Sequence, residues 1–455
     1  MNNNSIKVDV AVLGSGPGGI SAAVAAARQG ADVVIVERMG YLGGNLVSGL
    51  PLLGYLDAQG RQVTGGLAQE LVDRLAEMGG TWGHRRCPFH NSTTNINPLY
   101  LRIILFELMK EHNIKVLLHC EVTGTNVVNG KLESVKVTGK GKEIEIEAKV
   151  FVDGTGDGDV AYMAGARYHK GQEGTGVMQP PTLMFNIGGI DFDAFFDYLE
   201  ENPEELPYGL GLGNLRPGYD AEYFRGSPNH IFFGLKDTIK KLREEGKCPI
   251  DRDTLIYIRQ PIHDQVAINT IRILNFDGSD VFDLSRGELE SHLQIMPLVQ
   301  MLQAHVPGFE NCYLASISSS IGVRESRRFV GIKTLTEADV VSGSIPEDTV
   351  GLGSYVIDIH SGDGADTYLK TLDAYGIPYG CTVAADIDGL MLSGRCISVD
   401  AVAFGSTRIM PTLMAVGEGA GIGAAIAAKE NISPRDVDVA KIREILEEQK
   451  AILSV

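Results

Sequence analysis

The sequence predicts an α/β protein of two domains, in which a smaller α+β domain is inserted into a larger one built on a parallel sheet. Residues 7–37 read strand, glycine turn, helix and strand, the pattern of a βαβ unit. Segments of similar character return after residue 380, whereas composition and periodicity change from about residue 170. We therefore predict a discontinuous domain of residues 1–169 and 380–455, and an inserted substrate, or cap, domain of residues 170–379.

The turn of the N-terminal unit carries the motif G-x-G-x-x-G, formed by Gly14, Gly16 and Gly19. The first glycine allows a tight turn, the second lets a pyrophosphate approach the backbone, and the third lets helix and strand pack closely. Pro17 suits the first helical turn, where its missing N–H has no partner to lose. The unit predicts a Rossmann-like dinucleotide site in which the helix N-terminus faces the phosphates.

Glu37 ends the second strand, about 20 residues past the glycines. An acid at this place accepts hydrogen bonds from an adenosine ribose that lacks a 2′-phosphate. NAD and FAD both carry such a ribose, so this unit alone leaves the two cofactors open. An ordinary βαβ unit with a glycine-rich turn is disfavoured, because the strands, helix, glycines and acid occur together.

The composition of the chain limits the kinds of binding partner that we expect. The chain has 455 residues, of which 44% are hydrophobic and 22% charged, with a net charge of −18. This charge disfavours nucleic acid and anionic membrane surfaces. No secretory pattern opens the chain, and the apolar segment of residues 410–428 contains Glu418, so we expect a core helix rather than a membrane span. We expect a cytoplasmic protein.

No metal site is predicted. The six cysteines form no C-x-x-C pair, which disfavours a zinc ribbon or an iron–sulfur cluster. His84, Cys87 and His90 lie in residues 82–97, which we expect to be a loop, but a fourth ligand is missing. Surface positions or substrate contacts are the favoured interpretation of these three side chains.

The remaining elements follow from hydrophobic periodicity and turn residues. A second glycine-rich turn, at residues 153–159, is not interpreted as a dinucleotide site because Asp157 and Asp159 would repel a pyrophosphate. In the helix of residues 286–305, the spacing directs Leu289, Leu293, Met296 and Leu298 inward. The other expected elements are helices over 65–79, 98–113 and 438–452 and one starting near 414, a hairpin through Asn129 and Gly130, and strands within 144–152, 255–276, 352–360 and 389–394.

Several motifs together resemble those of the FAD-dependent oxidoreductases of the glutathione-reductase-like two-domain class. The resemblance covers nearly the whole chain. The motifs are GSGPGG at 14–19, LGGN at 42–45, VDGTGDGDVAYMAGA at 152–166, MQPPTLMF at 178–185, GVRESRRFVG at 322–331, DIH at 358–360, SGRCIS at 393–398 and GSTRIMPTLMAVGEGAG at 405–421. Many relatives carry a His shortly after the SGRCIS-like stretch, where this chain has none, so another group must take any role that this His has.

The resemblance implies that the cofactor is FAD. Glu37 then holds the ribose, the loop at 42–45 crosses the cofactor, and the helix N-terminus near Thr412 points at the flavin ring, whose reduced form its dipole favours. The cofactor-binding residues that we expect are Gly14, Ser15, Gly16, Pro17, Gly18, Gly19, Glu37, Arg38, Gly43, Gly44, Asn45, Val122, Gly154, Thr155, Gly156, Asp157, Gly394, Arg395, Arg408, Met410, Pro411 and Thr412.

Four residues are candidates for catalysis: His360, Arg324, His263 and Arg272. His360 follows an apolar strand, and strand ends in α/β folds face the ligand crevice. Histidine suits proton transfer, and an arginine can clamp a carboxylate. The alternative for each is a structural ion pair or a capped loop.

The expected function is hydride transfer between flavin N5 and a small organic substrate, by alkene reduction or by alcohol or C–C dehydrogenation. A hydratase or isomerase with a structural flavin, and an NAD-binding protein without flavin, are the alternatives. Only one full fingerprint is present, so we expect a separate electron donor or acceptor, such as NAD(P)H, a quinone or a redox protein. Assembly into a homo-oligomer is left open.

Overall fold

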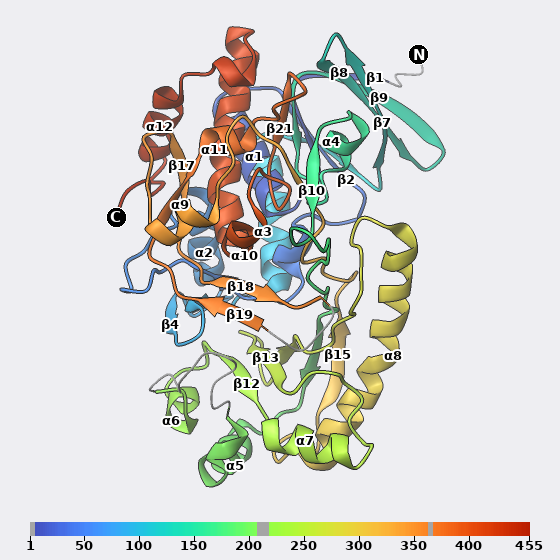
Figure 1. The fold of residues 1–455 in the computed structure, drawn as a ribbon, viewed down its shortest axis with the longest axis vertical. Helices are drawn as coiled ribbons and strands as arrows, with labels where there is room; N and C mark the ends of the chain where they lie inside the picture. The colour runs from blue at the N-terminus through green and yellow to red at the C-terminus, as the bar shows by residue number, and fades with distance from the viewer. Residues whose placement is uncertain (1–4, 207–217, 363–366) are drawn as a thin grey trace.

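The structure is a computed structural model, and it describes residues 5–206, 218–362 and 367–455. Figure 1 shows a larger domain above and a smaller one below, with α8 along one side. The expected α/β class is confirmed. The glycine stretch at 209–213 lies outside the described residues.

The larger domain is organised around a seven-stranded sheet whose centre is parallel, in the order β6-β2-β1-β9-β8-β7, with β21 beside β9. The hairpin of β7 and β8 turns at Asn129 and Gly130, which have φ values of 51° and 80°, as the Asn-Gly pair predicts. The strands are β1 (Ser5–Leu13), β2 (Val33–Glu37), β6 (Lys115–Leu118), β7 (Glu121–Val128), β8 (Lys131–Gly139), β9 (Lys142–Asp153) and β21 (Leu390–Leu392).

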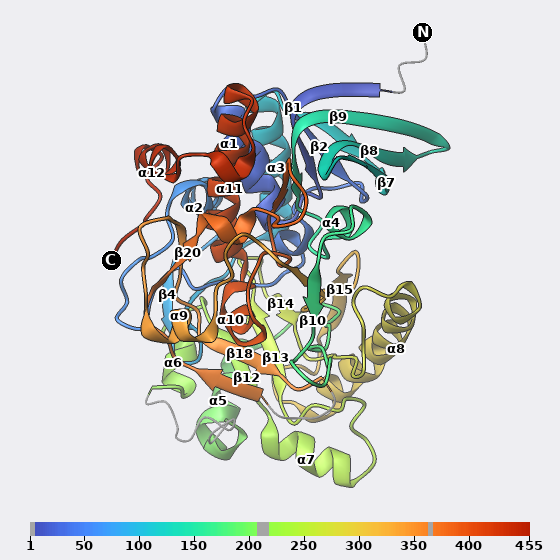
Figure 2. The same ribbon diagram turned by 45° about the horizontal axis from the view of Figure 1, so that its top comes forward.

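Two helices pack together beside this sheet, α1 (Pro17–Arg28) and α11 (Met410–Glu430). Figure 2 shows them side by side. A Cβ at Gly417 or Gly421 would clash with the backbone of α1, so these glycines permit the close approach. Helix α11 begins at Met410 rather than near Met414, because Pro411 fits its first turn. It is long and apolar enough to span a membrane, but 89% of that window is buried inside the fold.

Six further α-helices of the described residues complete the larger domain. Asn97 caps α3 with its side chain, and Pro98 follows at the first helical position. The helices are α2 (Gly66–Glu77), α3 (Pro98–Glu111), α4 (Asp159–Met163), α9 (Glu337–Ser342), α10 (Ala401–Thr407) and α12 (Val439–Glu448).

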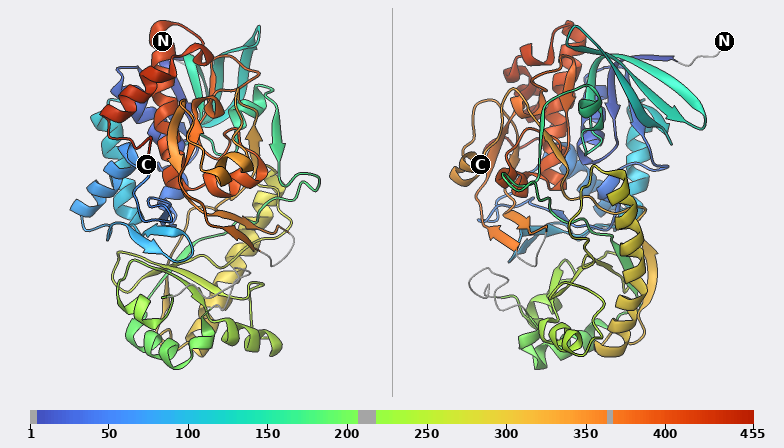
Figure 3. Two further views of the ribbon diagram at one scale, coloured as in Figure 1. Left: turned by 60° about the vertical axis from the view of Figure 1, so that its left-hand side comes forward. Right: turned by 45° about the vertical axis from the view of Figure 1, so that its right-hand side comes forward.

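The smaller domain contains an antiparallel five-stranded sheet in the order β12-β13-β14-β11-β15, and Figures 1 and 3 show this domain at the lower end of the molecule. Strand β15 is an edge strand of this sheet. The strands are β11 (Phe185–Gly188), β12 (Ile231–Gly234), β13 (Leu255–Arg259), β14 (Val266–Ile268) and β15 (Tyr313–Ile317), and the helices are α5 (Phe192–Glu201), α6 (Ala221–Arg225), α7 (Lys236–Glu244) and α8 (Val281–His305).

The predicted register of α8 is wrong for most of its length. Of the four side chains expected inside, only Leu298 is buried; Leu289, Leu293 and Met296 are exposed. The helix starts at Val281, capped by Asp280, and buries a different stripe that contains Gly287, Ser291 and Ile295. Both stripes are apolar enough to cover a sheet, so periodicity alone did not choose between them.

Residues 327–378 belong by their packing to the larger domain. Phe329, Ile357 and Tyr375 share a hydrophobic core with β1 and β9. The chain therefore returns to the core of the larger domain near residue 326, whereas the predicted domain boundary was at residue 379. The strand expected over 352–360 is interrupted, because Ser354–Val356 lie between two strands. The strands here are β10 (Tyr168–Lys170), β16 (Arg327–Phe329), β17 (Thr349–Gly353), β18 (Ile357–His360), β19 (Thr367–Lys370) and β20 (Tyr375–Pro378).

Residues 82–97, predicted as a loop, contain two of the strands of a small antiparallel sheet. Phe89 from this segment packs into the core of the smaller domain, so the segment bridges both domains. The three strands are β3 (Leu52–Leu53), β4 (Arg85–Cys87) and β5 (Asn91–Thr94).

Candidate active site

A groove runs across the carboxyl ends of β1 and β2 and the start of α1. Most of the residues expected to bind the cofactor line it. They are Gly14, Ser15, Gly16, Pro17, Gly18, Glu37, Arg38, Gly44, Asn45, Gly154, Thr155, Gly156, Asp157, Gly394, Arg395, Arg408 and Met410. The chain therefore gathers segments that are hundreds of residues apart into one groove.

The glycine turn at the groove has the geometry that a dinucleotide requires. Gly14 has a φ of 94°, and a Cβ there would clash with the backbone of Gly154 and Thr155, whereas a Cβ at Gly19 would clash with the carbonyl of Gly14. Gly16 is different, since the nearest atom to a Cβ there would be Gly154 O at 3.7 Å. Helix α1 begins at Pro17, and Gly16 before it provides no side-chain cap; the first turn has no acidic residue. Its positive end therefore meets open space of the kind that a pyrophosphate fills.

Glu37 is held in place beside this turn. Its Oε2 accepts hydrogen bonds from the backbone N–H of Ser15 at 3.0 Å and the Ser15 hydroxyl at 2.6 Å, and its Oε1 accepts one from Met39 N at 2.9 Å. The carboxylate lines the groove and is partly exposed. It can accept further hydrogen bonds from ribose hydroxyls, because a carboxylate has about four lone-pair sites.

Arg395 offers a cationic contact in the groove. Its Nη2 lies 2.8 Å from Asp157 Oδ1, which also accepts from the Ser326 hydroxyl at 2.7 Å. Its Nη1 is buried with no hydrogen-bond partner. A buried unpaired guanidinium N–H is costly, and a phosphate oxygen would satisfy it. The expected repulsion from Asp157 is offset by this arginine, and these residues fit a bound dinucleotide.

Five expected cofactor residues do not line the groove: Gly19, Gly43, Val122, Pro411 and Thr412. Gly43 turns the chain into the short 3-10 helix η1 (Gly44–Val47) with a φ of 108°. Val122 of β7 packs in the hydrophobic core of the larger domain, and Thr412 of α11 is fully buried. These five residues therefore belong to the turns, helices and strands around the groove and do not line it.

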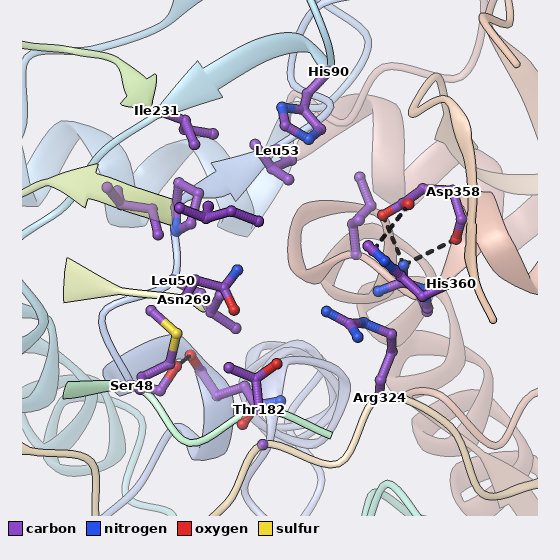
Figure 4. A pocket seen from close by; sticks show the side chains of 18 of the residues that line it. Ser48, Leu50, Leu53, His90, Thr182, Ile231, Asn269, Arg324, Asp358 and His360 are labelled. Carbon is purple, nitrogen blue, oxygen red and sulfur yellow. Dashed lines mark hydrogen bonds and ion pairs between the residues drawn. The ribbon is translucent and has the colours of Figure 1, made fainter. Parts of the chain in front are cut away.

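A second cavity adjoins the groove, and Figure 4 shows it from close by. Apolar side chains from β3 and the five-stranded sheet line one part, among them Leu53, Ile231 and Ile256. Polar and charged side chains line the other part, where Arg324 points into the cavity and Asp358 and His360 lie together. The groove and the cavity share Asn45, Ser48, Ser320, Val323, Arg395, Arg408 and Met410.

Asp358 is the centre of the charged part. Its carboxylate accepts hydrogen bonds from Tyr355 Oη at 3.0 Å and Arg408 Nη2 at 2.9 Å, and its Oδ1 lies 3.1 Å from His360 Nε2. Although burial opposes it, the hydrogen bond from His360 and the charges of Arg408 and Arg324 hold the pKa of Asp358 well below its usual value. Asp358 is therefore an anion that fixes three neighbouring side chains.

His360 is neutral in this setting. Burial, with Arg324 and Arg252 nearby, lowers its pKa to about 3, although Asp358 acts in the opposite direction. Its Nδ1 lies 3.4 Å from Arg252 Nη2. An imidazole whose Nε2–H donates to Asp358 and whose Nδ1 faces an arginine is consistent with this state.

Arg324 and Arg252 bring further positive charge. Arg324 Nη1 donates to the carbonyl of Pro180 at 2.7 Å, and burial and Arg408 lower its pKa to about 9. Burial and Arg272 lower the pKa of Arg252 to about 10. Both remain cations at neutral pH. The structure thus brings the predicted His360 and Arg324 into one cavity.

The other two predicted catalytic residues are not in this cavity. The His263 side chain is 92% exposed and pairs with Asp264 at 2.7 Å, because its loop projects into solvent. Arg272 is buried but pairs with Asp251 at 3.2 Å, behind Arg252. Neither lines the cavity.

Sequence reasoning missed Arg252 and Tyr355, which line the cavity, and gave Asp358 no role. His90, expected at the surface or in contact with substrate, is buried and also lines the cavity. The DIH motif at 358–360 contained the signal for Asp358, whereas nothing around Arg252 marks it. His84 stacks on Tyr55 with ring centroids 4.2 Å apart, and His90 stacks near Tyr355. Among the described residues, no group of three or more His, Cys, Asp or Glu side chains is arranged to hold a metal ion.

The fold and the groove define a dinucleotide-binding protein of the Rossmann type, and a family model identifies the dinucleotide. The model of the FAD dependent oxidoreductase family matches residues 9–446. The chain therefore belongs to this family, its cofactor is FAD, and it is an enzyme. No curated protein matches the sequence.

Solved structures with a similar fold are distant in sequence. A geranylgeranyl bacteriochlorophyll reductase-like protein from Thermoplasma acidophilum is 13% identical over 98% of this chain and 84% of its own, with a TM-score of 0.49. A flavoprotein/dehydrogenase from Cytophaga hutchinsonii is 14% identical over 98% and 82%, with a TM-score of 0.46. The myxobacterial chondrochloren halogenase is 14% identical over 97% and 79%, with a TM-score of 0.45.

Proposed function

We propose that this enzyme transfers a hydride between N5 of its FAD and a small organic substrate held in the second cavity. The observation that carries the proposal is the shared wall between the dinucleotide groove and this cavity, which includes Asn45, Arg408 and Met410. A substrate in the cavity would therefore lie next to the part of the cofactor that reaches this wall. When bound, FAD supplies the site that accepts or releases the hydride.

The chain supplies binding, orientation and proton handling. Arg324 points into the cavity and can hold a polar group of the substrate. His360 donates its Nε2–H to Asp358, which leaves Nδ1, in a looser contact of 3.4 Å with Arg252 Nη2, to exchange a proton with a substrate heteroatom or through one water. The apolar side chains of β12 and β13, such as Ile231 and Ile256, exclude water from the rest of the substrate.

A separate molecule must complete the redox cycle. The chain carries one full G-x-G-x-x-G fingerprint, so a diffusible NAD(P)H, quinone or redox protein is the proposed partner. The proposed location is the cytoplasm.

Anaerobic spectroscopy of the purified holoprotein tests the proposal. Alkenoates, sugars and alcohols are mixed with the oxidised enzyme and, after chemical reduction, with the reduced enzyme. The proposal expects bleaching of the flavin by one class of compound, or its reoxidation. Product formation with no change of the flavin spectrum would instead support the alternative, a hydratase or isomerase in which the flavin is structural.

A further inference from the structure

The charged part of the second cavity is unbalanced. Arg252, Arg324 and Arg408 line it, and Asp358 is the one carboxylate among the described lining residues. Asp358 pairs with Arg408 at 2.9 Å, and His360 is neutral. Arg252 donates to the carbonyl of Asn269 at 3.3 Å, and Arg324 donates to that of Pro180. These two arginines therefore have carbonyl partners, and neither has a carboxylate of a described residue within ion-pair distance.

A positive charge held out of water without a counter-ion is costly. An anion in the cavity would remove much of this cost, because the attraction between charges is strong where water is excluded. An arginine also presents two parallel N–H groups to a carboxylate or phosphate. The cationic part of the cavity is therefore built for an anionic group.

The rest of the cavity has the opposite character. Leu50, Leu53, Ile231, Phe233, Ile256 and Ile258 line it. Figure 4 places Leu50, Leu53 and Ile231 across the cavity from Arg324 and His360. A ligand that satisfies both parts has an anionic head and an apolar body of several carbon atoms.

We propose that the cavity selects amphipathic organic anions, with the head group at Arg324 and Arg252 and the apolar body against β3, β12 and β13. This proposal rests on the proposed function, since it names the substrate class of the same cavity. Both carboxylates and phosphate monoesters have the required head group, and the experiment separates them.

The test is a titration of the oxidised holoprotein, read from the flavin difference spectrum, so it needs no turnover. The probes are straight-chain saturated carboxylates of two to ten carbons, the matching alkyl phosphates and the matching neutral amides. We expect the dissociation constant of the better anion series to fall by about fourfold per added methylene until the cavity is full. We expect the amides to bind at least about tenfold more weakly at equal length.

Arg324→Met should weaken binding of the anions by about tenfold or more and leave amide binding unchanged. Arg167→Met is the matched control, because Arg167 is on the surface and pairs with Asp386. The comparison of anions with amides uses the parent enzyme, so it stands even where the Arg324 variant does not fold. Equal binding of amides and anions, or anion binding that ignores chain length, overturns the proposal.

These results are separable from the redox proposal. Chain-length-dependent binding of anions without any flavin bleaching or reoxidation by unsaturated analogues supports this inference and contradicts hydride transfer. Bleaching of the flavin by neutral alcohols, which bind without an anionic head, would support hydride transfer and contradict the selection of amphipathic anions.

A separate observation concerns the outer face of α8. Phe282, Leu289, Leu293 and Met296 lie at helical spacing and are 81%, 62%, 67% and 47% exposed. Strand β15 lies beside α8 in Figures 1 and 3, is an edge of its sheet, and exposes Tyr313 and Ile317. We call this surface the α8–β15 face. An apolar face of this extent usually has a partner.

We infer that a second copy of the chain covers the α8–β15 face around a two-fold axis. Helix α8 has 25 residues and is about 37 Å long. This apolar surface continues onto the edge strand β15, as an interface between two copies requires, since a standard interface buries roughly 800 Å² per partner. If the two-fold axis passes between Leu289 and Leu293, Leu289 of one copy contacts Leu293 of the other copy, and the reverse contact forms as well. The edge strand β15 can also pair with β15 of the second copy. The one Arg of α8, Arg286, pairs with Asp283 and Glu290, and no Lys is present, which disfavours an anionic membrane.

The mass in solution tests this inference. We expect a dimer for the parent, and a monomer for the double variant Leu289→Glu, Leu293→Glu with its flavin retained. The control is Ile103→Glu, because Leu99, Ile103 and Phe106 form another exposed apolar stripe, on α3. A monomeric parent, or a dimer broken by Ile103→Glu and not by the α8 variant, overturns the assignment.

Discussion

Asp358 and His360 face each other across one residue of β18, with His360 Nε2 3.1 Å from Asp358 Oδ1. Side chains two apart on a strand point to the same side, so the short strand aims both groups into the cavity. Arg408 approaches Asp358 from α10, and Arg252 approaches His360 from the smaller domain. This pair therefore joins the two domains at the cavity.

His360→Asn should keep FAD and thermal stability near those of the parent but slow substrate-driven flavin reduction or reoxidation by about 10²-fold. The reason is that His360 is placed for proton exchange and Asn cannot take its role. Stopped-flow absorbance measures the rate. His263→Asn is the control, since His263 lies in solvent. A normal rate in His360→Asn means that the residue is structural.

Gly16→Val should abolish FAD retention, because the β-branched side chain would occupy the open space that the pyrophosphate takes. The measurement is flavin released on denaturation, per mole of folded protein. Gly124→Val is the control: Gly124 is in β7, and the nearest atom to a Cβ there would be 3.9 Å away. Full flavin content in folded Gly16→Val would contradict the placement of the cofactor.

Arg395→Met should raise the dissociation constant of FAD by about 10- to 100-fold, because its buried Nη1 lacks a protein partner and would lose a phosphate contact. Reconstitution of apoprotein followed by flavin fluorescence gives the constant. Arg167→Met should bind FAD as the parent does. Equal affinities in the two variants would show that Arg395 only pairs with Asp157.

Glu418 gives a pH-dependent prediction. Burial raises its pKa to about 7, although the Leu67 N–H, 3.1 Å from Oε2, favours the charged form. The folded state holds this proton between pH 4.5 and 7 where the unfolded state releases it. Its contribution to stability is therefore present below pH 4.5 and is lost as pH rises through about 7.

Glu418→Gln removes this titration, so its melting temperature should fall less than that of the parent between pH 5 and pH 7.5. Differential scanning calorimetry of both proteins at matched ionic strength measures the difference. The same slope in both would mean that Glu418 has an ordinary pKa in the folded protein.

Steady-state kinetics with two small-molecule redox partners should be ping-pong, because one flavin site must serve both partners in turn. Initial rates over a grid of both concentrations should give parallel double-reciprocal lines. Intersecting lines would indicate a ternary complex and a second nucleotide site.

Local features of the chain were predictable from sequence because local chemistry fixes them. The Gly14 turn, the Asn129–Gly130 hairpin and the Asn97–Pro98 start of α3 depend on backbone conformations that few residues allow. The groove followed from them, since the carboxyl ends of parallel strands share one edge of the sheet. His360 was predictable from its place at the end of an apolar strand.

Other features depended on contacts between distant segments. His263 and His360 are both histidines near strand ends, yet one lies in solvent and the other bonds Asp358. The apolar stripe of Leu289 and Leu293 was visible in the sequence, but which stripe of α8 meets the sheet was decided by the packing of Ile295 and Leu298.

The βαβ unit, the acid at Glu37 and the expectation of a dinucleotide could be derived from the sequence, because each rests on residues within about forty positions and on backbone geometry. The arrangement of Arg252, Arg324 and Arg408 around one carboxylate beside an apolar wall became visible in the folded chain alone. Those residues come from different elements, and their charge becomes chemically significant only when the fold removes water from around them.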